Sequence, residues 1–281
     1  MNAPDPTPVV TRRRAWLLVA LAGLLVGVTA LVPPVAQDPA YHHFADRRVL
    51  LRVPNFLNVA SNLPFLLVGA LGFVFLAWNR RSGGDDAFIT PGARRPYWLF
   101  FTGIALTGVG SAYYHWRPDN GTLFWDRLPM TIAFMALLAS VIGERIGRRA
   151  GALSLWPLLI AGVASTLYWH LGEQRGVGDL RPYGLVQFGS IVLIPLILVL
   201  FPARYTGTGY LWLSIAWYGL AKAFEYFDHG LFMRVGVSGH TWKHLASAVG
   251  AYWILRMLER RRPLTHEVPP GARPGTAPVL C

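Results

Sequence analysis

The chain has 281 residues, of which 53% are hydrophobic, and its formal net charge is +12. A mean hydropathy of +0.38, with the apolar residues gathered in long blocks, is typical of membrane-spanning helices rather than of a soluble domain. The charge comes mainly from arginines that flank those blocks, which favours membrane anchoring and argues against nucleic-acid binding. The single cysteine, Cys281, excludes an intrachain disulfide and a thiolate metal cluster.

Eight apolar blocks follow one another along the chain, each about long enough to cross a hydrocarbon core of about 30 Å. We therefore expect helices at residues 15–32, 54–78, 96–115, 123–143, 151–171, 184–201, 209–228 and 239–258. The loops between them are short and contain Gly, Pro and charged residues. Both ends of the chain are Pro-rich and lack periodicity, so we expect disordered tails at residues 1–11 and 261–281.

The distribution of arginine predicts the orientation of these spans. If the N-terminus lies in the cytoplasm, the cytoplasmic segments carry more arginines than those on the opposite side, which favours cytoplasmic location of both termini. The first block follows Arg12, Arg13 and Arg14 and resembles either a signal peptide or an uncleaved anchor. We favour the anchor because a cut near Ala36 would place Pro34 close to the cleavage site, where small residues are required.

Three histidines occupy unusual places in these blocks. His115 ends the third block, and His240 and His244 lie in the first two turns of the eighth. The predicted orientation places all three near the outer membrane surface, and the i, i+4 spacing puts His240 and His244 on one helix face. A single such histidine is most simply an interfacial side chain. Three that converge are best satisfied by a metal ion, and zinc with three protein nitrogens and an open position is typical of catalytic sites.

Two further polar residues lie at the same predicted depth. Ser111 precedes His115 by one turn, and Asp126 opens the fourth block. A carboxylate in this place can act as a general base toward water and then protonate a leaving group. The serine hydroxyl can donate to an oxyanion or can orient a metal ligand. The residues therefore indicate a zinc hydrolase within the membrane, with Asp126 and Ser111 as catalytic residues.

Other polar and aromatic residues in the blocks have simpler interpretations. Lys222 and Glu225 can pair at i, i+3, and Lys243 should face away from the two histidines beside it and extend to the interface. We expect Asn58 and Asn62, which share a helix face, to join helices rather than to contact substrate. An aromatic belt is expected from residues that include Tyr97, Trp98, Trp116, Trp169, Tyr210 and Trp253.

Four segments together resemble the alkaline ceramidase family, which shares a superfamily with adiponectin-receptor-like and Per1-like membrane proteins. They are Gly110-Ser111-Ala112-Tyr113-Tyr114-His115, Trp125-Asp126-Arg127-Leu128-Pro129-Met130, His240-Thr241-Trp242-Lys243-His244, and residues 55–63, which are similar to the start of the family's first core helix. The resemblance implies a core of seven transmembrane helices with residues 15–32 as an additional N-terminal helix. The chain then divides into a tail and anchor (1–36), a hydrolase core (37–260) and a C-terminal tail (261–281).

The resemblance also implies a chemistry. Zinc would be held by His115, His240 and His244, with Asp126 and Ser111 beside it. The substrate would be a ceramide-like lipid of the bilayer, cleaved at its amide bond to a fatty acid and a sphingoid base. The zinc site would lie toward the periplasmic or lumenal side. Nothing in the sequence indicates an oligomeric state.

Two departures from the family bear on this interpretation. Eukaryotic alkaline ceramidases carry an acidic, calcium-binding stretch before the first core helix. Asp38 and Asp46 provide oxygen ligands of the right type there, so Ca²⁺ is a further expectation, but Asn55 stands in place of an acidic residue. The superfamily also contains receptor-like members, so a lipid-binding receptor or sensor with structural zinc is the alternative. A transporter is disfavoured because the polar groups gather at one end of the spans.

Overall fold

The structure is a computed structural model that describes residues 8–81 and 87–264. Within those ranges the chain is helical, and its only β features are two isolated bridges. The long helices are α1 (Pro8–Leu31), α3 (Leu63–Arg81), α4 (Arg95–Trp116), α5 (Asn120–Arg145), α6 (Arg148–Gln174), α7 (Arg181–Leu200), α8 (Thr208–Tyr226) and α10 (Gly239–Arg260). The short ones are η1 (Pro39–His42), α2 (Phe56–Ala60), η3 (Pro91–Arg94) and α9 (Asp228–Val235). The all-α prediction is confirmed for this part of the chain.

Five helical segments among the described residues are long and apolar enough to cross a membrane. They are Arg12–Leu31, Phe56–Asn79, Asn120–Arg145, Arg148–Gln174 and Arg181–Leu200. The other long helices, α4, α8 and α10, contain histidine, lysine, glutamate and several aromatic residues within their spans. The apolar character of the five segments is that of a membrane protein, as the composition predicts.

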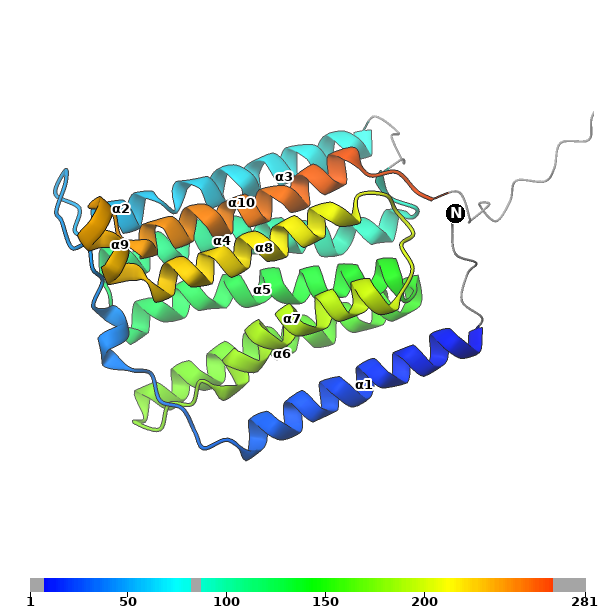
Figure 1. Cartoon of the computed structure of the whole chain (residues 1–281), viewed down its shortest axis with the longest axis horizontal. Helices are drawn as coiled ribbons and strands as arrows, with labels where there is room; N and C mark the ends of the chain where they lie inside the picture. Colours follow the sequence, from blue (N-terminus) through cyan, green and yellow to red (C-terminus); the bar gives the residue numbers. More distant parts are fainter. Residues whose placement is uncertain (1–7, 82–86, 265–281) are drawn as a thin grey trace, which may run out of the picture.

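The long helices lie side by side in one bundle (Figure 1). Helix α4 packs against α3 and α5, α10 packs against α8 and α3, and α5 also contacts α6 and α7. Helix α1 lies at the edge of the bundle, where it contacts α7, and only 6% of its apolar window is buried. Its Arg14 donates a hydrogen bond of 2.7 Å to the carbonyl of Leu200. This peripheral position fits the additional N-terminal helix expected from the sequence.

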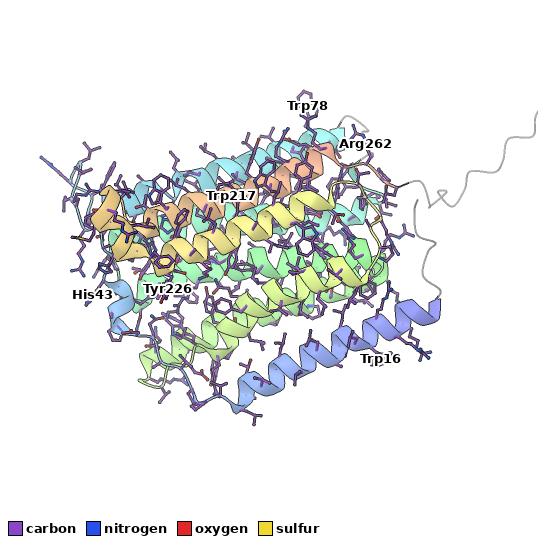
Figure 2. The ribbon with its side chains drawn as sticks, viewed as in Figure 1. Trp16, His43, Trp78, Trp217, Tyr226 and Arg262 are labelled. Atoms are coloured by element: carbon purple, nitrogen blue, oxygen red, sulfur yellow. The ribbon has the colours of Figure 1, made fainter. Side chains whose placement is uncertain are left out.

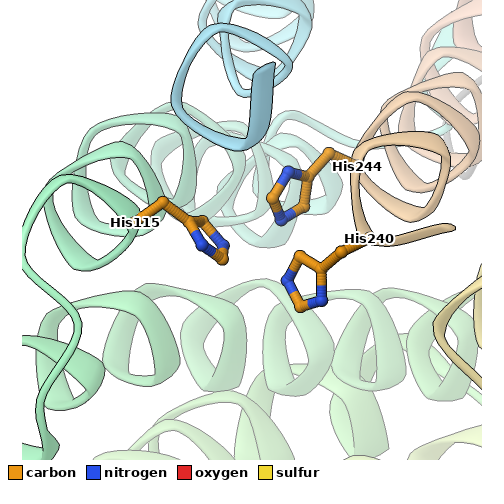
Figure 3. A group of neighbouring side chains, drawn as sticks. All are labelled: His115, His240 and His244. Atoms are coloured by element: carbon orange, nitrogen blue, oxygen red, sulfur yellow. The ribbon is translucent and has the colours of Figure 1, made fainter. Parts of the chain in front are cut away.

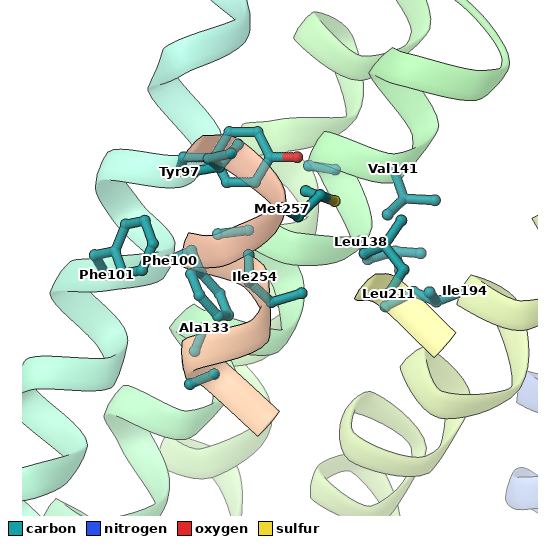
Figure 4. Packing of buried hydrophobic residues seen from close by; sticks show 14 of the residues in the cluster. Tyr97, Phe100, Phe101, Ala133, Leu138, Val141, Ile194, Leu211, Ile254 and Met257 are labelled. Atoms are coloured by element: carbon teal, nitrogen blue, oxygen red, sulfur yellow. The ribbon is translucent and has the colours of Figure 1, made fainter. Parts of the chain in front are cut away.

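A hydrophobic core fills one end of the bundle (Figure 4). It is formed by the N-terminal half of α4, by α5 and α7, and by the C-terminal half of α10, with Phe101, Leu138, Ile194 and Ile254 among its members. Because α10 begins with His240 and α4 ends with His115, the parts of these two helices that form the core lie away from the histidines. Apolar packing is therefore most extensive away from the histidines, and a smaller apolar cluster lies beside them, formed by Phe44, Tyr114, Leu123 and Trp169.

Aromatic side chains are divided between the surface and the interior. Trp16 and Trp78 point away from the bundle and are 62% and 71% exposed (Figure 2). Tyr97 and Trp169, which the sequence analysis places in an interfacial belt, are instead completely buried. Their polar atoms have partners inside the protein, since Tyr97 donates to Glu144 and Trp169 donates to Glu173. The aromatic belt is thus a wrong prediction for these two residues.

The helix expected at residues 54–78 is divided into α2 and α3. Helix α2 ends at Ala60, four residues before Pro64, and a proline ring clashes with the carbonyl four positions earlier in a continuous helix. A second difference is α9, where a loop was expected after residue 228. This helix ends at Gly236, which has the positive φ of 71° that glycine adopts readily.

The body of the protein extends beyond α10. Arg261 is fully buried, donates to Glu144 at 2.6 Å and to the carbonyl of Ala87 at 2.7 Å, and lies 4.2 Å from the ring centre of Tyr205. Residues 261–264 therefore belong to the folded part rather than to the predicted C-terminal tail. The remainder of that tail, with Cys281, and residues 1–7 lie outside the described residues.

Candidate metal centre

Three imidazole rings from two helices face one point in the bundle (Figure 3). His115 comes from the last turn of α4, and His240 and His244 come from the first turns of α10. Their ring centroids are 4.7–4.9 Å apart, and one nitrogen from each ring lies within 4.8 Å of the others. All three side chains are buried. The predicted convergence of these residues is confirmed.

The N-terminus of α10 is held firmly at this place. Ser238 caps the helix by accepting a hydrogen bond from the backbone N–H of Thr241 at 3.1 Å. Asp228 accepts another from the N–H of His240 at 2.9 Å. Gly239 allows the close approach of α8, because a Cβ there would lie 2.1 Å from the carbonyl oxygen of Phe224. The position of His240 thus follows from the backbone contacts around it.

Ser61 orients the ring of His244. Its Oγ lies 2.8 Å from Nδ1 of His244 and 3.1 Å from the carbonyl oxygen of Asn58, to which it donates. The Ser61 oxygen can then accept the Nδ1–H of His244, which leaves Nε2 without a proton and ready to bind a metal. Asn58 joins the helices by accepting from Ser238 at 3.0 Å and from Thr241 at 2.8 Å, as predicted for it.

His115 provides the strongest sign that a ligand belongs here. Both of its ring nitrogens are buried and have no hydrogen-bond partner among the described residues. Its backbone carbonyl accepts a 2.8 Å hydrogen bond from Asn55, whose positive φ of 48° is one that Asn tolerates. A carboxylate at position 55 could not donate this bond, which explains why an amide stands there. A buried polar side chain needs a partner, and a metal ion would supply one.

The cluster could hold a metal ion, and zinc is the ion that three histidines most often bind. A tetrahedral ion with nitrogen ligands at about 2.0–2.1 Å holds those nitrogens roughly 3.3 Å apart. Since the nitrogens already lie within 4.8 Å of one another, small rotations of buried rings would complete the site. Three neutral imidazoles also leave one coordination position open, as catalytic zinc sites do.

Asp126 and Ser111 lie in the same part of the bundle. The Asp126 carboxylate is buried and interacts with the Ser111 hydroxyl, and both side chains line one cavity with His244. Gly110 makes this proximity possible, because a Cβ at that position would lie 1.9 Å from the carbonyl oxygen of Trp125. The α4 and α5 backbones therefore meet where the two predicted catalytic residues sit.

Two cavities meet beside Asp126. The first has a volume of about 140 Å³ and extends along the bundle between apolar side chains such as Phe65, Leu211 and Ile254. The second, of about 390 Å³, is lined by residues of η1, α5, α7 and α10 and of the segment before η1, and it includes Tyr41, Arg127 and Gln187. Asp126, Met130 and Lys243 line both cavities. These three side chains thus mark the junction between an apolar space and a more polar one.

The position of Lys243 corrects the sequence analysis. Its ammonium group does not extend to the interface but lies 2.6 Å from Oε1 of Glu225 and 3.3 Å from Nε2 of His240. Glu225 also accepts from Lys222 at 2.7 Å, which confirms the predicted i, i+3 pair. The Lys243 side chain is only 16% exposed, because its flexible four-carbon chain bends toward the site.

The segment between α1 and α2 (residues 32–55) covers the histidine cluster at the end of the bundle. Phe44 packs on His115 and His240, with ring centroids 4.6 and 5.1 Å apart. The N–H of Ala45 donates to Asp228 at 3.1 Å, so the carboxylate that holds His240 also holds this cover. Together these contacts close the histidines off from water at the end of the bundle.

The two candidate calcium ligands have other partners in this cover. Asp46 is buried and accepts hydrogen bonds from the Arg48 side chain at 2.6 and 2.8 Å, and Asp38 accepts from the N–H of Ala40 at 2.8 Å. Among the described residues they join no group of three histidine or acidic side chains able to share an ion. The calcium site stays a prediction without structural support.

The contacts of Ser61, Asp228 and Lys243 around the cluster could not be predicted from the sequence. Each acts through a contact between segments far apart in the chain, which spacing along one helix does not reveal. Comparison with protein-family models and with curated proteins gave no match for this chain. The arrangement of the site is therefore the main guide to function.

Proposed function

We propose that this protein is a zinc-dependent hydrolase of the membrane that cleaves the amide bond of ceramide-type lipids. One observation carries the proposal. Three buried imidazoles converge, His115 has no hydrogen-bond partner in the described structure, and one of the three residues, His244, lines an apolar cavity together with the buried Asp126. The resemblance of residues 110–115, 125–130 and 240–244 to alkaline ceramidases supports the choice of an amide substrate.

The proposed roles follow from the chemistry of each group. Bound zinc would polarise a carbonyl oxygen and lower the pKa of a water molecule. Asp126 would accept a proton from the attacking water and transfer it to the nitrogen of the leaving amine. Ser111 would keep the Asp126 carboxylate in place, since the two side chains interact across α4 and α5.

The cavities support an amphiphilic substrate. The first cavity is lined mostly by apolar side chains and matches a fatty acyl chain, whereas the second carries tyrosine, arginine and glutamine side chains that suit the polar amine half. With the amide at their junction, the scissile bond would lie beside Asp126. Products would be a fatty acid and a sphingoid base.

The proposed setting is a bilayer crossed by seven core helices and by α1. Both termini would be cytoplasmic and the histidines would lie near the opposite surface, as the distribution of arginine favours. A lipid substrate could then enter from the membrane without leaving its apolar surroundings.

A metal-dependence assay tests the proposal. Purified protein treated with EDTA should release no sphingoid base from a detergent-solubilised ceramide, and stoichiometric zinc should restore release. His115→Ala should neither retain zinc nor hydrolyse the lipid. His170→Ala is the matched control, because His170 lies outside the cluster and contacts Gln174. Zinc-loaded wild-type protein that binds ceramide without cleaving it would favour the receptor alternative.

A further inference from the structure

Lys243 has surroundings that a purely structural ion pair does not need. Like Asp126, Lys243 lines both cavities, and its ammonium group lies 3.3 Å from Nε2 of His240. Glu225 fixes it there with a 2.6 Å contact. An ion pair that served only to join α8 to α10 would not need to border a cavity.

Lys222 provides an internal comparison. It pairs with the same carboxylate at 2.7 Å, but it lines neither the first cavity nor the second. Its side chain is 36% exposed, compared with 16% for Lys243. Glu225 thus holds two cations, of which only Lys243 borders the cavities where a substrate would lie.

We propose that Lys243 is a catalytic residue that binds the oxygen of the substrate carbonyl. This inference rests on the proposed amide hydrolysis and assigns the oxyanion role to Lys243, which leaves Ser111 to position Asp126. A cation held by a fixed carboxylate, away from bulk water, interacts strongly with a charge that develops beside it.

The oxygen of water forms a bond to the amide carbon while its proton passes to Asp126, and the electron pair of the C=O double bond moves to the carbonyl oxygen. Lys243 donates an N–H hydrogen bond to that oxygen and keeps its proton. When the double bond forms again, the C–N bond breaks, and Asp126 gives its proton to the departing amine nitrogen.

Two substitutions test the assignment, with Lys222→Met as the control for Lys243→Met. Both substitutions remove a cation from Glu225, but only Lys243→Met removes a cation from the lining of the cavities. We expect Lys243→Met to lower kcat for ceramide by about a hundredfold or more with KM changed much less, as loss of an oxyanion donor does. Lys222→Met should stay within a few fold of wild type. Zinc content, measured by mass spectrometry, should be the same in all three proteins.

A binding measurement separates this inference from the proposed function. Hexadecylphosphonate carries a tetrahedral anion on an alkyl chain, and hexadecanamide is its neutral counterpart. Titration calorimetry of the zinc-loaded proteins should show phosphonate affinity reduced about tenfold or more in Lys243→Met alone, with amide affinity unchanged. Equal phosphonate affinity in Lys243→Met and wild type would overturn the assignment, as would equal kcat losses in the two variants. If wild-type protein cleaves no amide, the proposed function fails, and the phosphonate titration still decides whether Lys243 binds an anion.

Discussion

Asp126 differs from the structural carboxylates of this protein in what surrounds it. Asp179, for example, accepts hydrogen bonds from the Arg181 side chain at 2.8 and 3.0 Å. Asp126 is also buried, yet no ion pair to it is found in the described ranges, and it borders both cavities beside His244. A carboxylate that is close to a cationic site but not bonded to an arginine keeps its lone pairs available for proton transfer.

Asp126→Asn should therefore abolish turnover without loss of metal. We expect kcat to fall by about a thousandfold or more, since an amide cannot accept the proton of water, while zinc content stays at the wild-type level. Ser111→Ala should have a smaller effect, because it removes only a group that positions the carboxylate. Single-turnover rates rank the two variants, and a larger loss for Ser111→Ala would contradict these roles.

Asp46 is the residue through which pH should act on the cover of the site. Hydrogen bonds from Arg48 hold the pKa of its carboxyl below the ordinary value. A carboxyl with a depressed folded pKa stabilises the protein above its unfolded pKa of about 3.9, and this contribution is lost as the pH falls through the lower, folded value.

Comparing wild type with Asp46→Asn tests this pH dependence of stability. At about pH 6, wild type should unfold at a higher temperature than Asp46→Asn. This difference in Tm should shrink as the pH falls below about 4. Thermal unfolding in one detergent over a series of pH values measures it. If the difference in Tm between wild type and Asp46→Asn does not change with pH, the charge of Asp46 in its pair with Arg48 does not contribute to stability.

At the level of helices, the contact between α4 and α5 is what brings Ser111 to Asp126. Gly110 lies at the closest point of this contact, where only a hydrogen fits under the carbonyl of Trp125. The hydroxyl and the carboxylate come from different helices, so any change in the distance between those helices changes their interaction.

Gly110→Ala should consequently lower both stability and activity. The added methyl forces the two helices apart, at a cost of roughly 1–3 kcal/mol or more. Gly219→Ala in α8 is the matched control, since no atom lies within 4 Å of its added Cβ and alanine favours a helix by about 0.5–1 kcal/mol. Opposite shifts of Tm in the two variants are expected, and a neutral Gly110→Ala would show that the contact can relax.

The elements that could be predicted are those with a continuous signal along the chain. Eight apolar blocks produced eight long helices in the described residues, and the i, i+4 spacing placed His240 and His244 together. Helix α9 was missed because glycine and polar residues in that stretch also fit a loop. The role of Lys243 was missed because an angle around a helix gives the direction of Cβ, whereas a long side chain can bend back toward its neighbours.

Contacts between side chains of different helices could not be predicted from the sequence. Ser61 meets His244 only because the helix breaks before Pro64 and α3 packs on α10. The burial of Tyr97 likewise depends on Glu144 in α5, and that of Trp169 on Arg127 of α5, whose guanidinium lies 4.4 Å from the ring centre of the tryptophan. Sequence patterns report one helix at a time, and these positions require the arrangement of several.

For the whole molecule, the bundle has two distinct ends. The histidines and their cover lie at one end, and the other carries Arg145, Arg261 and the long apolar core. An orientation with the arginine-rich end in the cytoplasm satisfies the positive-inside rule.

Labelling with a membrane-impermeant maleimide tests this orientation. Cys281 is the single thiol of the chain, so intact cells should remain unlabelled and inverted membrane vesicles should react. The variant that combines Cys281→Ser with Arg234→Cys should show the reverse, because Arg234 is an exposed residue of α9 at the histidine end. Labelling of the native cysteine in intact cells would contradict cytoplasmic termini.

The division of the three imidazoles between α4 and α10 has a consequence for biosynthesis. The ribosome makes His115 first and must then complete α5, α6, α7 and α8 before His240 and His244 emerge. A partly translated chain has a single imidazole at this place, and one ligand binds zinc far more weakly than three. Under the proposed function, the nascent protein would therefore be inert toward surrounding lipids until α10 has docked, and assembly of the bundle itself would control when chemistry can begin.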